Sequence, residues 1–70
     1  MEGLSARNRL TGVVRSVTLG TIMAEVVVDV AEQEIVAVIT RGAAERLLLQ
    51  EGENVTVVVK ATDVMIAIGT

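Results

Sequence analysis

The sequence contains no cysteine and no histidine. Without cysteine the chain forms no disulfide and no thiolate metal site. Without histidine it has neither an imidazole base nor an imidazole zinc ligand, which removes most hydrolase arrangements. The carboxylates of Glu25, Asp29, Glu32 and Glu34 occupy positions typical of outward charges on strands and turns. We therefore expect a protein that is not an enzyme and has no metal ion bound directly by its side chains.

Phenylalanine, tyrosine and tryptophan are also absent, and the formal net charge is −3. Barrels and grooves that bind nucleic acid rely on aromatic side chains for base stacking, and on positive charge for the phosphates. An acidic chain without aromatic residues is therefore a poor candidate for binding nucleic acid.

Long apolar runs are missing as well. Acidic residues between positions 25 and 34 interrupt the richest stretch, so no segment approaches the ~18–20 residues of a membrane span. The start lacks the pattern of a secretion signal. At 70 residues and 51% hydrophobic content, the chain is long enough for one domain and too apolar for a disordered tail. We expect a single domain over residues 1–70, located in the cytoplasm, with no membrane partner.

What is present is β-branched alternation. From Ile22 to Val30, apolar residues at even positions face one side of the chain, as in a half-buried strand. Gly20 is expected to supply a positive φ for a tight hairpin before it, and residues 32–34 form a polar turn after it. The predicted strands cover residues 9–18, 22–30, 35–40, 54–60 and 64–68.

The period changes between the third and fourth of these strands. Thr40 has the position of a helix N-cap, and Gly52 that of a C-terminal stop. The apolar residues that would share one helix face are Ala43, Ala44, Leu47 and Leu48. The predicted fold class is therefore all-β: an OB-like five-stranded barrel with one short helix between strands 3 and 4.

Two of the predicted strands, residues 35–39 and 64–68, are apolar at every position. A small barrel has one interior, and the outer face of a strand normally meets water. Because a domain this small buries only ~60% of its unfolded surface, association is the remaining means of stabilising it. The pattern predicts a homo-oligomer.

The opening stretch raises a separate question. Arg7, Arg9 and Arg15 lie within the first fifteen residues, with only Glu2 against them. Either they solvate an apolar N-terminal segment, or they bind an anion.

The segments "SARNRLTGVV", "AEVVVDV", "AVIT" and "EGENVTVVVKATDVMIA", at this spacing, closely resemble the molbindins, small molybdate-binding proteins related to TOBE domains. The resemblance runs from Leu4 to about Ile68. It implies an OB-like barrel that assembles as a hexamer of three dimers and binds molybdate or tungstate at subunit interfaces. Its implied role is intracellular molybdenum storage and homeostasis, without catalysis.

Carried over by position, the resemblance implies an oxyanion site made from two segments of different subunits. One subunit would supply the first four of these residues and its partner the other four: Ser5, Ala6, Arg7, Asn8, Thr40, Lys60, Ala61 and Thr62. Arg7 of one chain and Lys60 of another are thus expected to meet the same anion. The sequence departs from the family at Ala43, where members often carry serine, so one hydroxyl donor is missing.

The chemistry of these residues supports such a ligand. Molybdate is a tetrahedral dianion that offers only acceptors, so its site must be built from donors. Hydroxyl, amide, guanidinium and ammonium groups in the two segments are all donors. Two cations would roughly neutralise the dianion and limit the cost of burying it. Each residue also has an ordinary structural role: Thr40 suffices as a helix cap, and Lys60 as a charge at a strand end.

Other functions remain open at this point. The chain could be an oxyanion-sensing regulatory module, an OB-type domain for nucleic acid or protein interaction, or a purely structural assembly protein. Pterin-bound molybdenum is disfavoured as cargo because no aromatic residue is available to stack on a pterin.

Overall fold

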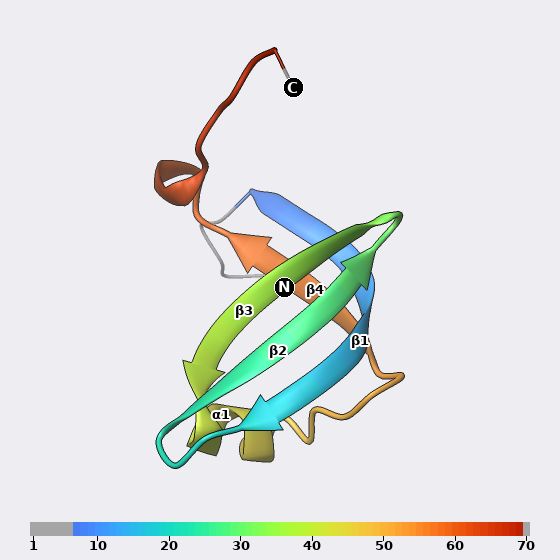
Figure 1. Cartoon of the computed structure of the whole chain (residues 1–70), viewed down its shortest axis with the longest axis vertical. Coiled ribbons are helices and arrows are strands. Elements are labelled where there is room, and N and C mark those ends of the chain that lie inside the picture. Colours follow the sequence, from blue (N-terminus) through green and yellow to red (C-terminus); the bar gives the residue numbers. More distant parts are fainter. Residues whose placement is uncertain (1–6, 70) are drawn as a thin grey trace.

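The computed structural model describes residues 7–69. Four antiparallel strands form one sheet in the order β3-β2-β1-β4, and a short helix lies between β3 and β4 along the chain (Figure 1). The elements are β1 (Asn8–Leu19), β2 (Met23–Val30), β3 (Gln33–Thr40), α1 (Arg41–Arg46), β4 (Asn54–Val59) and the 3₁₀ turn η1 (Ala61–Asp63).

Strand β1 is long enough to pair with two neighbours. Its first half, residues 8–13, pairs with β4, and its second half, residues 13–19, pairs with β2. Gly12 lies where the halves meet, and a Cβ there would be 2.5 Å from the carbonyl oxygen of Asp29. Only glycine permits this close approach of β1 to β2, because any side chain would collide with backbone.

A β-bulge follows directly. Val14 pairs with Val28 and Ser16 with Val27, which leaves Arg15 as the extra residue. The extra residue shifts by one position which side chains of β1 face the core. Before the bulge, even-numbered Val14 faces the core, and after it odd-numbered Val17 packs against the core.

The core is made of valines from the two central strands. Val14, Val26 and Val28 are at most 3% exposed, and they form its centre. The side chains packed against them are Val17, Val30, Ala37, Ile39, Leu49, Val55 and Val57. The alternation predicted for β2 is confirmed, since Ala24, Val26 and Val28 are buried on one face.

The predicted fifth strand is not formed within one chain. Residues 64–68 belong to no strand, and the side chains of Met65, Ile66 and Ile68 are 85–92% exposed. After β4 the turn η1 directs the chain away from the sheet, so this segment reaches neither sheet edge (Figure 1). The five-stranded barrel predicted for the chain is therefore wrong for a single copy, which has a four-stranded sheet open between β3 and β4.

Two further details differ from the sequence-based expectations. Gly20 does not adopt a positive φ; its amide instead donates to the carbonyl oxygen of Met23 at 2.8 Å and closes the hairpin. Helix α1 ends at Arg46, well before Gly52, because Leu48 takes a left-handed conformation with φ 55°. Gly52 does have a positive φ, 91°, but in the loop that precedes β4.

Candidate anion-binding site

Five of the predicted site residues lie at one end of the β1–β4 ladder. The last pair of this ladder joins Asn8 to Val59. Arg7 precedes Asn8 and Lys60 follows Val59, so both lie one step beyond the pair, and Ala61 and Thr62 continue into η1. Ser5 and Ala6 lie outside the described residues, and the structure gives them no position.

The register sorts these side chains onto two faces. Directly opposite residues in an antiparallel ladder share a face, and neighbours along a strand alternate. Leu10 lies opposite Val57, which packs against the core, so Asn8 and Leu10 belong to the inner face. The same alternation, continued one residue past the end of the ladder, puts Arg7 and Lys60 on the outer face. The structure therefore brings the backbone of Asn8 to this end, but it does not place the Asn8 side chain beside that of Arg7.

The outer face carries one more cation, which the predicted site did not include. Arg9 pairs with Val58 and is exposed. It lies two residues from Arg7 along β1 and diagonally across from Lys60. We name Arg7, Arg9 and Lys60 the cation cluster. The sequence signal for Arg9 was its spacing of two from Arg7, which on a strand means the same face.

The turn η1 adds neutral donors beside the cation cluster. The amide of Asp63 donates to the carbonyl oxygen of Lys60 at 2.9 Å, and that of Val64 to Ala61 at 3.4 Å. The amides at the start of such a turn have no acceptor within it, so the N–H groups of Ala61 and Thr62 are left for acceptors outside the turn. The hydroxyl of Thr62 is a further donor. This end of the chain therefore combines positive charge with hydrogen-bond donors, which is what an oxyanion requires.

Thr40 lies elsewhere. It caps α1, and its Oγ accepts from the amide of Ala43 at 3.0 Å. Figure 1 shows α1 toward one end of the long axis and η1 toward the other. Within one chain, Thr40 therefore cannot contact an anion held by Lys60. The geometry does not require Arg7 and Lys60 to come from different chains, because one chain already brings them to the same end.

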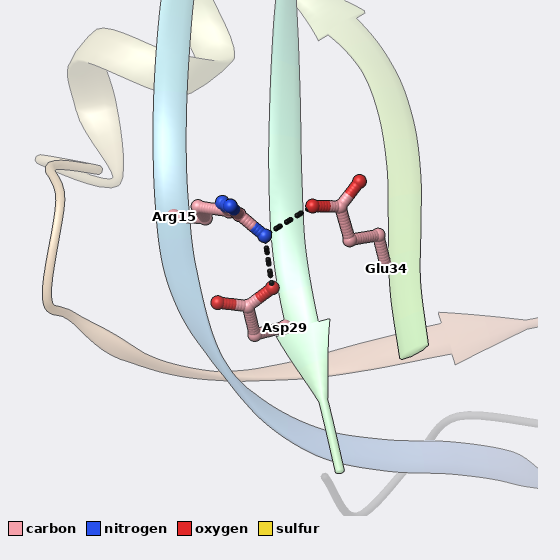
Figure 2. Close-up of polar contacts among 3 residues, drawn as sticks. All are labelled: Arg15, Asp29 and Glu34. Carbon is pink, nitrogen blue, oxygen red and sulfur yellow. Dashed lines mark hydrogen bonds and ion pairs between the residues drawn. The ribbon is translucent and has the colours of Figure 1, made fainter. Parts of the chain in front are cut away.

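Arg15, one of the three arginines near the start of the sequence, forms ion pairs within its own chain. From the bulge its Nη1 pairs with Oδ1 of Asp29 on β2 at 3.5 Å, and with Oε2 of Glu34 on β3 (Figure 2). These three side chains are about half exposed. Arg15 thus bridges neighbouring strands and does not belong to the cation cluster.

Residues 7–69 hold no group of three or more side chains placed to bind a metal ion. No helix of that part of the chain is both long and apolar enough to span a bilayer.

The chain is similar to known proteins over nearly its whole length. The TOBE domain family matches residues 4–66. "Molybdenum-pterin-binding protein 1" of Clostridium pasteurianum is 44% identical over 64 residues, which cover 90% of this chain and 94% of that protein.

Two solved structures have the same fold. A molybdate-binding protein from Sporomusa ovata superposes with a TM-score of 0.89 at 39% identity, covering 91% of this chain and 96% of the other. MopII from Clostridium pasteurianum gives a TM-score of 0.86 at 42% identity, with coverages of 93% and 98%. By sequence and by fold, over nearly its whole length, this chain belongs to the TOBE domain family.

Proposed function

We propose that this protein binds molybdate or tungstate as an oxyanion, for molybdenum storage and homeostasis in the cytoplasm, and that it does not act as an enzyme. The observation that carries the proposal is the cation cluster beside the donors of η1. A tetrahedral dianion has acceptors only, and this end of the chain offers guanidinium, ammonium, hydroxyl and amide donors. The names of the relatives, which refer to molybdenum and molybdate, support the same ligand.

The binding unit in this proposal is a homo-oligomer, a hexamer built as a trimer of dimers. Apolar side chains on the outer face of β3 support association, since Val36 is 58% and Val38 63% exposed. The segment 64–68 adds a second apolar surface. Faces of this kind, repeated on several elements, are typical of surfaces that pack against another subunit.

The five-stranded barrel of the proposal is completed between chains. Strands β3 and β4 are the open edges of the sheet, and a hollow of about 460 Å³ opens between them. Its lining is mainly apolar, with Val26 and Ile39 on one side and Val57 on the other. Residues 64–68 of a second copy supply the apolar fifth strand that one chain lacks. Filling the hollow then adds both hydrophobic burial and backbone pairing.

Association also explains how all the proposed site residues reach one anion. One chain supplies Arg7 and Asn8 together with Lys60, Ala61 and Thr62, and Ser5 and Ala6 are included only because they precede Arg7 in the sequence. Thr40 comes from a second chain, because within one chain it lies at the other end of the molecule. In this arrangement the site is complete only in the oligomer.

A second candidate ligand is a molybdenum pterin, favoured by the name of the Clostridium pasteurianum relative. The chain has no aromatic residue that could stack on a pterin ring, and for this reason we rank the free oxyanion first.

Native mass spectrometry with and without molybdate tests the proposal. We expect a hexamer that gains whole molybdate ions, with no ions retained on any monomer. A matched titration with phosphate should show weaker binding, because the proton on monohydrogen phosphate finds no acceptor among donors. A protein that gains no molybdate, or that binds it equally well as a monomer, would contradict the proposal. Mass gained only from the pterin complex would favour the second candidate.

A further inference from the structure

We propose that Arg9 selects the charge of the bound anion, favouring a tetrahedral dianion over a monoanion of the same shape. This inference rests on the proposed function and adds a residue and a selectivity to it. Arg9 lies outside the set of residues predicted to bind the oxyanion.

The register places Arg9 within reach of the same anion as its neighbours. Its direct cross-strand partner is Val58, an uncharged residue. The alternation, continued one residue past the ladder end, puts Arg7 and Lys60 next on this face. Diagonal neighbours across an antiparallel pair are about 7–8 Å apart at their α-carbons. An arginine side chain spans such a distance, and it carries five N–H donors.

The charge of Arg9 is also uncommitted within residues 7–69. In that range Arg15 pairs with Asp29 and Glu34, and Arg41 with Glu45, whereas no carboxylate pairs with Arg9. The strand beside Arg9 explains the difference, because β4 has no acidic residue.

The charges of the cluster match a dianion. Arg7 and Lys60 alone would balance a dianion, but Asp63 of η1, three residues after Lys60, lowers their formal sum to +1, and Arg9 restores it to +2. Removing Arg9 leaves +1, which balances a monoanion and leaves a dianion under-neutralised. Arg9 is therefore the residue that tunes the cluster to a doubly charged ligand.

Electrostatics gives this role a signature that a structural role would not have. The attraction between Arg9 and a ligand is proportional to the charge on the ligand. Tungstate and perrhenate are both tetrahedral tetraoxoanions of heavy metals, with charges of −2 and −1. If loss of Arg9 weakens tungstate binding about tenfold, as expected for a partly exposed charge, perrhenate binding should fall only about threefold, the square root of that factor.

The experiment compares Arg9→Gln with Arg15→Gln in the intact oligomer, titrating each with tungstate and with perrhenate. Arg15 is the matched control: it is also an exposed arginine of β1, but it lies in the half that pairs with β2, where Asp29 and Glu34 neutralise it. We expect Arg9→Gln to lower the ratio of tungstate to perrhenate affinity about threefold and Arg15→Gln to leave the ratio unchanged. Arg9→Lys, which keeps the charge, should retain most of the preference.

The outcomes separate this inference from the proposed function. If the unaltered protein binds no tungstate, the proposed function fails, and this inference fails with it. If the unaltered protein binds tungstate but Arg9→Gln lowers both affinities equally, or matches Arg15→Gln, only the role of Arg9 is overturned. A loss of binding that accompanies dissociation of the oligomer would also overturn it, because Arg9 would then be an interface residue.

Discussion

Arg9 and Arg15 lie on the same strand, yet the structure gives them different surroundings. Arg15 sits in the half of β1 that pairs with β2, where Asp29 and Glu34 neutralise it (Figure 2). Arg9 sits in the half that pairs with β4, opposite Val58 and near Lys60. The comparison shows that the neighbouring strand, more than the arginine itself, decides whether a cation serves the fold or a ligand.

The two halves of β1 differ in burial as well as in charge. The half beside β2 contributes Val14 and Val17 to the core. The half beside β4 begins with exposed residues, at positions 8–11. Substitutions in the first half should therefore act on stability, and substitutions at the ladder end should act on binding.

The largest effect is expected where the two halves meet. Gly12→Ala would bring a Cβ to 2.5 Å from the carbonyl oxygen of Asp29, so the backbone of β1 or β2 must shift. We expect a loss of about 2–3 kcal/mol in the free energy of unfolding, measured by urea denaturation at one fixed protein concentration. The control is Gly42→Ala in α1, where the nearest atom, Nη1 of Arg46, is 3.5 Å away. That variant should gain up to about 1 kcal/mol from helix propensity. Equal effects at both positions would show that the close approach at Gly12 carries no cost.

Lys60→Ala tests the ladder end. Removing one cation from a site that holds a dianion should cost about 2 kcal/mol, which is roughly a thirtyfold loss of molybdate affinity. The free energy of unfolding should stay within about 0.5 kcal/mol of the unaltered value, because Lys60 is exposed. Calorimetric titration and urea denaturation of the same preparation measure both quantities. Unchanged affinity would exclude Lys60 from the site.

The smallest effect is expected at the bulge. Arg15→Gln removes two half-exposed ion pairs, which should cost less than about 1 kcal/mol of stability, and less still at high salt. Molybdate affinity should not change, because Arg15 is already neutralised and lies outside the cation cluster. An affinity loss as large as that of Arg9→Gln would remove the distinction between the two arginines.

Much of the fold could be predicted locally. Period-two alternation identified β2 and β4, and the apolar run at residues 35–40 and the segment before Gly20 identified β3 and β1. Thr40 was identified as a helix cap because capping depends on residues only three positions apart. The end of α1 was misjudged, because Leu48 adopts a left-handed conformation that its residue type does not signal. The predicted positive φ at Gly20 was wrong, since the hairpin there closes with another backbone geometry.

The candidate site was predictable only in part. The residues near each end of the chain were identified by their donor chemistry and by resemblance. Their grouping was not, because it depends on the register that sets Asn8 opposite Val59. Register also separates the side chain of Asn8 from that of Arg7 and adds Arg9 to the outer face. A period-two pattern within one strand carries no information about which residue of another strand lies opposite.

The sequence by itself determined the strands, the short helix, the apolar excess and the donor chemistry, because each of these depends on residue type and on spacing within a few positions. Only the tertiary structure decided that Arg15 is neutralised, that no carboxylate of residues 7–69 pairs with Arg9, and that Thr40 and Lys60 lie at different ends of the chain. It also decided that residues 64–68 stay outside the sheet of their own chain. The physical reason is the same in every case: these outcomes depend on strand pairing between segments far apart in sequence, on a glycine that lets two strands approach closely, and on a turn that sets the direction of the chain after β4.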